Sequence, residues 1–223
     1  MDANEVVAWL ERRGSRRNVE GMARYGIHTV RAFGVPVGTI KQLAKQVGRN
    51  HGLAMALWQT GWYDARTLAA LVDDPLAVTP RQMDAWAADL DNWAICDTVC
   101  FHLFDKSPHA WQKAREWATA PEEFVKRAAF ALMASLALHD KAAPDERFLP
   151  MLPLVERGAR DERNFVKKGV SWALRAIGRR NRALHAAALP VATRLARSDE
   201  PASQWVGKDA LRDFERARRR KAR

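Results

Sequence analysis

Trp93 and Asp97 stand four residues apart in the segment NWAICDT, residues 92–98. On a helix this spacing places both side chains on one face, one turn apart. An indole ring attracts a cation to its face, and a neighbouring carboxylate neutralises the positive charge. The pair is therefore suited to hold a cationic group. A core tryptophan beside a solvated acid is the simpler interpretation of these two residues alone.

A second tryptophan lies within a basic stripe in the segment 165–179. Lys168, Trp172, Arg175 and Arg179 follow one another by four, three and four residues, which places them on one face of a helix. Basic groups around an aromatic ring suit contact with a phosphate backbone and a base or sugar. The alternative is a partly buried tryptophan covered by lysine and arginine stems. Apolar residues form a separate stripe: Val166, Val170, Ala173, Leu174 and Ile177.

Arg127 lies in the segment 124–132, within the first turns of an expected helix and off its apolar stripe. A guanidinium in that place can bind a phosphate through two parallel N–H groups. A plain surface arginine is the simpler interpretation of this segment alone.

Almost the whole chain has the pattern of helices, and no alternation typical of strands lasts more than a few residues. Thr79 followed by Pro80 predicts a helix start, and Asn92 is a suitable N-cap for the helix that carries Trp93. We also expect a helix over residues 19–31. Helix pairs recur at roughly 30–45 residues, the range of helical repeats. The sequence therefore predicts an all-α fold, a curved α–α superhelix (solenoid) of helix pairs, with a compact non-repetitive helical domain as the alternative.

The composition favours a polyanionic partner. The chain of 223 residues has 37 Lys and Arg against 26 Asp and Glu, a formal net charge of +11. We expect one domain over residues 1–215 and a basic tail over 216–223. No stretch is long and apolar enough for a membrane span, and we expect a cytoplasmic protein. The only cysteines, Cys96 and Cys100, are expected to be free thiols, and no histidine stands at metal-ligand spacing, so we expect no metal.

Several segments together resemble the AlkD family, the HEAT-like-repeat alkylpurine DNA glycosylases. Their order and approximate separations agree from about residue 5 to 215. The chain departs from the family pattern at Asn92, Ala94 and Pro36, which leaves the preferred lesion open. The segments that carry the resemblance are Met22-Ala23-Arg24-Tyr25, Leu57-Trp58, Trp93-x-x-x-Asp97, Lys126-Arg127-Ala128-Ala129 and Phe165-Val166-Lys167-Lys168-x-x-x-Trp172-x-Leu174-Arg175.

The resemblance implies that the helix pairs of the superhelix are HEAT-like, and it implies specific roles for several residues. Trp93, Asp97 and Trp172 match the catalytic pocket of the family. Arg127 matches a residue that contacts the DNA backbone by the lesion, and Tyr25 matches a position near the DNA-facing surface. We expect Trp93, Asp97, Arg127 and Trp172 to meet on one concave face. The basic stripe of Lys168, Arg175 and Arg179 is expected to bind the phosphates of DNA.

The expected activity is hydrolysis of the N-glycosidic bond of cationic N3- or N7-alkylated purines in duplex DNA, without metal or cofactor. We expect a bacterial-type monomer that associates with the nucleoid when it binds DNA. Two alternatives stay open. One is a catalytically silent HEAT-like protein that binds DNA structures or damage, and the other is a helical scaffold for protein partners.

Overall fold

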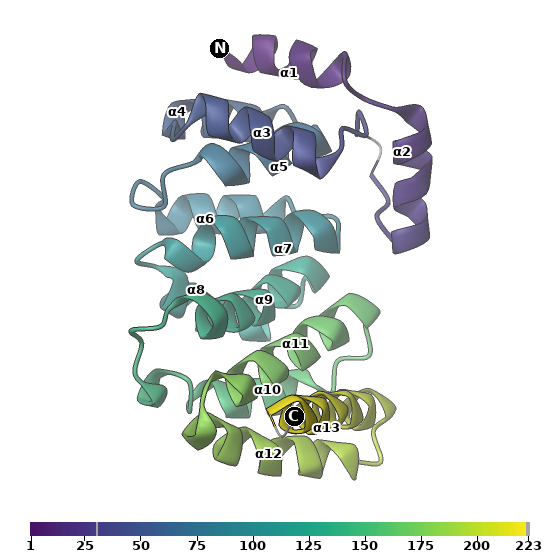
Figure 1. Cartoon of the computed structure of the whole chain (residues 1–223), viewed down its shortest axis with the longest axis vertical. Coiled ribbons are helices and arrows are strands. Elements are labelled where there is room, and N and C mark those ends of the chain that lie inside the picture. The colour runs from purple at the N-terminus through teal and green to yellow at the C-terminus, as the bar shows by residue number, and fades with distance from the viewer. Residues whose placement is uncertain (30, 222–223) are drawn as a thin grey trace. The chain divides into compact units, whose positions relative to one another are not determined.

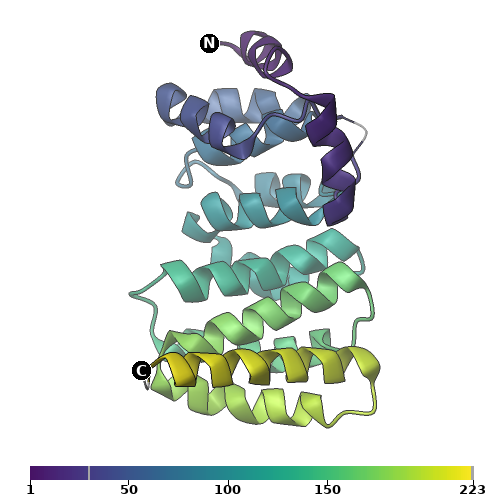
Figure 2. The same ribbon diagram turned by 45° about the vertical axis from the view of Figure 1, so that its right-hand side comes forward.

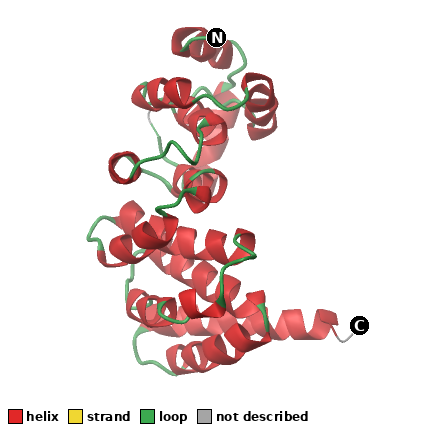
Figure 3. Cartoon of the chain, turned by 90° about the vertical axis from the view of Figure 1, so that its left-hand side faces the viewer, coloured by secondary structure: helices red, strands yellow, loops and turns green. Residues whose placement is uncertain are grey.

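The computed structural model describes residues 1–29 and 31–221 as helices joined by loops, without a strand in that part of the chain (Figure 3). The predicted all-α class is confirmed. Contacts group the chain into an N-terminal unit, Met1–His109, and a C-terminal unit, Ala110–Arg223. None of the described helices has both the length and the apolar character that a bilayer crossing requires.

The N-terminal unit is built on α5, which packs against α3, α4 and α7. Figure 1 shows α2 upright beside the other helices of this unit. The rings of Trp58 and Trp86 stack in its core, with centroids 3.9 Å apart and planes within 4°. The elements are α1 (Ala3–Glu11), α2 (Arg16–Met22), η1 (Ala23–Tyr25), α3 (Val37–Val47), α4 (His51–Gln59), α5 (Tyr63–Val72), α6 (Pro80–Ala88), α7 (Trp93–His102) and η2 (Phe104–Lys106).

Two helix starts predicted from side-chain caps are confirmed. The Thr79 hydroxyl accepts a hydrogen bond from the backbone N–H of Gln82, at the start of α6. The Asn92 side-chain oxygen accepts from the backbone N–H groups of Ala94 and Ile95, both at 3.1 Å. These caps satisfy N–H groups that a helix start leaves without an intrahelical partner. The cap on α7 fixes the first turn, which carries Trp93.

The helix expected over residues 19–31 is shorter than predicted. α2 ends at Met22, and η1 continues only to Tyr25, because Gly26 takes a left-handed conformation at φ 70°. Residue 30 lies outside the described residues. The following loop is held by the buried carboxylate of Asp64, which accepts from the N–H groups of Phe33 at 2.7 Å and Val35 at 2.8 Å.

The C-terminal unit is built on α9 and α11, which pack against each other. Helices α11, α12 and α13 also pack together, and Figure 2 shows α13 in yellow beside the green α11 and α12. The elements are α8 (Ala110–Glu116), η3 (Trp117–Thr119), α9 (Glu123–His139), η4 (Asp145–Arg147), α10 (Met151–Gly158), α11 (Asn164–Arg180), α12 (Arg182–Ala196) and α13 (Pro201–Lys221).

α9 is buried on nearly every side. All its residues from Arg127 to Ala137 have little exposed surface. Neighbouring helices approach closely in this unit: a Cβ atom built on Gly158 would lie 2.3 Å from the ring of Phe130. The close packing explains why this helix carries five alanines between 128 and 137.

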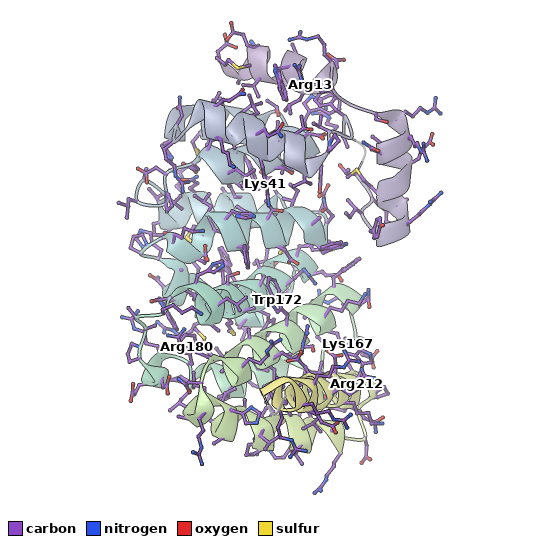
Figure 4. All side chains as sticks on the ribbon, in the orientation of Figure 1. Arg13, Lys41, Lys167, Trp172, Arg180 and Arg212 are labelled. Atoms are coloured by element: carbon purple, nitrogen blue, oxygen red, sulfur yellow. The ribbon has the colours of Figure 1, made fainter. Side chains whose placement is uncertain are left out.

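Arg180, labelled in Figure 4, closes the C-terminal end of α9. Its guanidinium donates hydrogen bonds to the carbonyl oxygens of Ala137 at 3.1 Å and Ala143 at 2.8 Å. It also lies over the ring of Phe148, 4.5 Å from the centroid. A cation is favourable at this end of a helix, where carbonyl groups lack intrahelical partners.

Candidate functional site

Trp93 and Asp97 lie off the buried face of α7, as their spacing predicts. Both side chains are half-buried, whereas the opposite face is buried. Because Asn92 caps the helix, Trp93 is its first residue and Asp97 stands one turn further along. The buried face consists of Ile95, Cys96, Val99 and Cys100.

The indole of Trp93 is held by the backbone of η1. Its Nε1–H donates a hydrogen bond of 2.8 Å to the carbonyl oxygen of Tyr25. The residue Tyr25 is itself 74% exposed. The structure therefore brings together Trp93 and Tyr25, both of which were singled out from the sequence. The contact is made by the backbone carbonyl of Tyr25 and not by its ring. A backbone carbonyl leaves no trace in a residue pattern, so the sequence offered no signal for this contact.

The thiols of Cys96 and Cys100 are buried and are not joined in a disulfide. Burial raises the pKa of the Cys100 thiol well above its usual range. The neighbouring Cys96 and the carboxyl groups of Asp97 and Asp105 add to the rise. Cys100 is consequently a neutral thiol at physiological pH, and its packing is that of a small apolar residue.

The two predicted stripes of α11 are present in the structure. The apolar stripe is buried, whereas Lys168 and Arg179 are exposed and Trp172 and Arg175 are half-buried. Figure 4 labels Trp172 on this helix. The tryptophan therefore belongs to the basic face, as the spacing predicted.

Acidic residues of α13 bind the basic face of α11. Arg175 lies 3.4 Å from Asp209, and Arg179 lies 3.4 Å from Asp213, both between nitrogen and oxygen. Ser171 Oγ donates a hydrogen bond of 2.6 Å to Asp209. These acids are not evident from the pattern of α11, because they stand more than 30 residues away from their partners. They neutralise part of the charge that the basic stripe would offer to DNA.

Arg127 is not the surface residue that its position in the sequence predicted. It is 6% exposed, and its Nη1 donates a hydrogen bond of 2.6 Å to the carbonyl oxygen of Phe165. The expectation was wrong because α9 is covered on nearly every side, so no face of its middle turns is left for solvent. Arg127 connects α9 to the first turn of α11. Its predicted contact with DNA stays a prediction.

A second basic cluster surrounds Asp161 in the C-terminal unit. Asp161 accepts hydrogen bonds from Arg163, at 2.6 and 2.9 Å, and from Lys126 at 2.9 Å. The Arg163 guanidinium and the Lys126 ammonium hold the pKa of the Asp161 carboxyl well below its usual range. Lys126 also lines a recess of about 170 Å³ together with Arg157 and Thr119.

The four residues predicted to meet are divided between the two units. Trp93 and Asp97 belong to the N-terminal unit, whereas Arg127 and Trp172 belong to the C-terminal unit. Their convergence stays a prediction. Within the described residues, no group of three or more His, Cys, Asp or Glu side chains is placed to hold a metal ion.

The comparisons with known proteins agree with this architecture. A solved structure of a protein from a family related to the HEAT-like repeat DNA glycosylases, with affinity for branched DNA structures, is 25% identical. The match has a TM-score of 0.77 and covers 95% of both chains, which supports the predicted class of an α–α superhelix of HEAT-like helix pairs. A designed armadillo repeat protein in complex with a (KR)4 peptide is 13% identical, with a TM-score of 0.41, over 79% of this chain and 92% of the designed one.

No curated protein matches the chain in sequence. The family model described as DNA alkylation repair enzyme matches residues 6–214. The match includes α7, α9 and α11, which carry the tryptophans, the carboxylate and the basic stripe. The chain therefore belongs to the DNA alkylation repair enzyme family.

Proposed function

We propose that this protein is a DNA glycosylase that releases cationic N3- and N7-alkylated purines from duplex DNA. The observation that carries the proposal is the arrangement on α7. The Trp93 indole is fixed by the Tyr25 carbonyl, and Asp97 stands one turn away on the same face, off the core. Membership in a family of DNA alkylation repair enzymes supports the same reaction class.

The chemistry needs few groups. Alkylation at N3 or N7 gives the purine a positive charge, so the base leaves without a strong general acid. The sugar then develops oxocarbenium character, which a carboxylate stabilises, and the same carboxylate can orient the attacking water. Asp97 is the residue we assign to both tasks. No metal or cofactor takes part in this scheme.

The tryptophans provide the cation-binding surfaces. An indole face beside a cation contributes roughly 0.5–2 kcal/mol, more when the contact is desolvated. Trp93 is pre-oriented, because its N–H is already bound to the η1 backbone. We expect the same kind of contact with the cationic nucleotide from Trp172 of α11, as the family resemblance implies.

The basic face of α11 would bind the phosphate backbone. Lys168 is exposed, and Arg175 and Arg179 are partly exposed at 32% and 52% of their side chains. A phosphate would replace the Asp209 and Asp213 carboxylates as the partner of the two arginines. The two carboxylate side chains are only 27% and 19% exposed, so the exchange has a desolvation cost that the phosphate contacts must offset.

The decisive experiment is base release from a duplex that contains N7-methylguanine, at saturating enzyme in a single turnover. Asp97→Asn should slow release by roughly 100-fold or more, the usual range for a lost acid–base or electrostatic group. Binding of lesion-free duplex should be retained, because the carboxylate acts when charge builds on the sugar. Glu11→Gln, which removes the same charge from an exposed residue of α1, is the matched control. Equal rates for Asp97→Asn and wild type would refute a catalytic Asp97.

A second candidate function is recognition of branched DNA without excision. It is favoured by the 25% identical solved structure, whose protein family is described as having affinity for branched DNA structures. A binder has no need of the Asp97 carboxylate, so the two functions separate experimentally. If four-way junctions bind more tightly than duplex and no alkylated base is released by wild type, the second function is supported. We expect a cytoplasmic monomer in either case, and size-exclusion chromatography with light scattering tests the monomer.

A further inference from the structure

We propose that the outer face of α13 is an additional binding surface for the phosphate backbone of duplex DNA, beyond the basic stripe of α11. We call it the α13 cationic face and define it by Lys208, Arg212, Arg216 and Arg219. The inference rests on the proposed binding of duplex DNA and is independent of base excision.

The four cations share one side of α13. They follow one another by four, four and three residues, and all four are exposed. The opposite side of the helix is buried, through Val206, Ala210 and Phe214 among others. At 1.5 Å per residue, the stripe from Lys208 to Arg219 is about 16 Å long.

Helix stability does not explain this arrangement. Cations in the last turn of a helix are favourable, because they lie beside unpaired carbonyl groups, and this accounts for Arg219. Lys208 and Arg212 lie in the middle turns of Pro201–Lys221, where that effect has faded. Like charges four residues apart destabilise a helix by about 0.2–0.5 kcal/mol per pair, and Lys208, Arg212 and Arg216 form two such pairs in succession. A bound polyanion relieves this repulsion.

The local partners of these cations leave them available. Arg212 lies 3.2 Å from Asp209 and Arg219 lies 2.5 Å from Glu215, yet the two arginine side chains are 61% and 73% exposed. The Lys208 ammonium donates a hydrogen bond of 2.9 Å to the neutral side chain of Gln204. These contacts are solvated, so a phosphate can replace or share them at little cost.

A further cation from α11 lies beside this face. The Lys167 ammonium stands over the ring of Trp205, 5.2 Å from its centroid. Trp205 precedes Lys208 by three residues and so lies on the adjoining surface of α13. Figure 4 labels Lys167 on α11 and Arg212 on α13.

Ion pairs between α11 and α13 lie between the basic stripe of α11 and the α13 cationic face. Asp209 and Asp213 lie between the helices and bind Arg175 and Arg179 of α11. The charge of the basic stripe of α11 is therefore reduced at Arg175 and Arg179. On the α13 cationic face, Arg212 shares Asp209 and Arg219 is paired with Glu215, whereas Lys208 and Arg216 face solvent. The α13 cationic face is accordingly the place in this unit where we expect much of the counterion release on DNA binding.

Duplex DNA fits this face better than an anionic lipid surface. The duplex carries one negative charge per roughly 1.7 Å of its axis, so a stripe of about 16 Å passes several phosphates. A helix that binds a lipid surface presents large apolar side chains beside its cations. Beside the α13 cationic face stand the exposed charged residues Glu215 and Arg218, and the ring of Trp205 is half-buried with the Lys167 ammonium over it.

The test compares two triple variants that remove the same charge. The first variant removes three charges of the α13 cationic face by Lys208→Gln, Arg212→Gln and Arg216→Gln. The control variant removes three charges from exposed residues of the same unit outside α13, by Lys141→Gln, Arg182→Gln and Arg197→Gln. The affinity for lesion-free duplex is measured from 50 to 200 mM salt. If each lost cation neutralised one phosphate, the log–log slope of the first variant becomes shallower by about 2.7. The ratio of the wild-type affinity to the affinity of that variant then falls roughly 40-fold between the lowest and the highest salt concentration, whereas the control keeps the wild-type slope.

The outcomes separate this inference from the proposed function. Single-turnover base release at saturating enzyme should be equal in wild type and both triple variants, and its absence in wild type bears only on excision. A charge-conserving variant, Lys208→Arg with Arg212→Lys and Arg216→Lys, should keep the wild-type slope, which excludes a mere folding defect. A first variant whose slope equals that of the control overturns the inference. So does a variant that loses binding only to phosphatidylserine vesicles and not to DNA.

Discussion

The indole N–H of Trp93 is bound to the backbone carbonyl of Tyr25 at 2.8 Å, across 68 residues of sequence. The bond connects α7 to η1, the short helix that Gly26 ends in a left-handed conformation. It fixes the rotation of the indole without using the tyrosine ring. The orientation of the proposed cation-binding ring is therefore a property of the fold of the N-terminal unit.

This relationship predicts different effects for two substitutions at Trp93. Trp93→Phe keeps an aromatic face but loses the N–H, so base release should fall by roughly 2- to 10-fold, the worth of one hydrogen bond. Trp93→Ala removes the ring as well and should cost more. Tyr25→Ala keeps the carbonyl and is the control at saturating enzyme, where a weaker contact of the tyrosine ring with DNA does not lower the rate. Single-turnover rates on N7-methylguanine duplex measure all three, and a Tyr25→Ala rate below that of Trp93→Phe would contradict the carbonyl as the orienting group.

The acids of α13 predict a variant that binds DNA more tightly. Asp209→Asn removes the charge that faces Arg175 and keeps an acceptor for the Ser171 hydroxyl. Affinity for lesion-free duplex should rise by several-fold at low salt, with a steeper salt slope by up to about 0.9. Asp199→Asn, on an exposed residue before α13, provides the matched loss of charge. Equal gains in both variants would mean that only net charge matters.

Arg180 should stabilise the C-terminal unit. Arg180→Ala removes the hydrogen bonds to the carbonyl groups of Ala137 in α9 and of Ala143 in the loop after it, and it removes the contact with Phe148. We expect a loss of about 2 kcal/mol in the free energy of unfolding, since bonds from a charged group are worth about 1.5–3 kcal/mol. Urea denaturation measures it, with Arg182→Ala, an exposed residue of α12, as the control. A midpoint shared by the two variants would show that the cap contributes nothing.

The raised pKa of Tyr63 predicts that the free energy of unfolding decreases at alkaline pH. Burial raises the pKa of Tyr63 to about 12, and the Asp64 carboxylate adds to the rise. An unfolded tyrosine titrates near pH 10, so the stability gained from the neutral phenol is complete below pH 10. It is lost as the pH rises from about 10 to 12. The chain has two tyrosines, so a Tyr25→Phe variant reports Tyr63 alone by tyrosinate absorbance. Titration near pH 10 in folded protein would contradict the buried phenol.

The sequence predicted those parts of the fold that depend on local pattern. Thr79 and Asn92 cap their helices as their side chains indicate, because a cap involves only neighbouring residues. The two stripes of α11 are visible in the sequence because one apolar face and one polar face suffice to define them. The family resemblance, carried by short segments in a fixed order, is confirmed by the family model.

What the sequence could not predict depends on contacts between distant segments. Arg127 looked exposed, because the pattern of one helix does not show how many neighbours cover it. The pairing of Arg175 with Asp209 joins helices that are separated by α12 in the chain. The bond from Trp93 to the Tyr25 carbonyl uses a group that every residue has. Each of these arises from packing, which residue types alone leave open.

The burial of α9 has a consequence for the dynamics of the C-terminal unit. Its residues from Arg127 to Ala137 are covered, and their backbone N–H groups lie within the helix. Such amides can exchange with deuterium only when the surrounding helices separate, so they report the opening of the whole unit and not local fraying. The amides of α9 thus provide a slow-exchange reference. The exchange rates of α11 and α13, before and after DNA binds, can be compared with it.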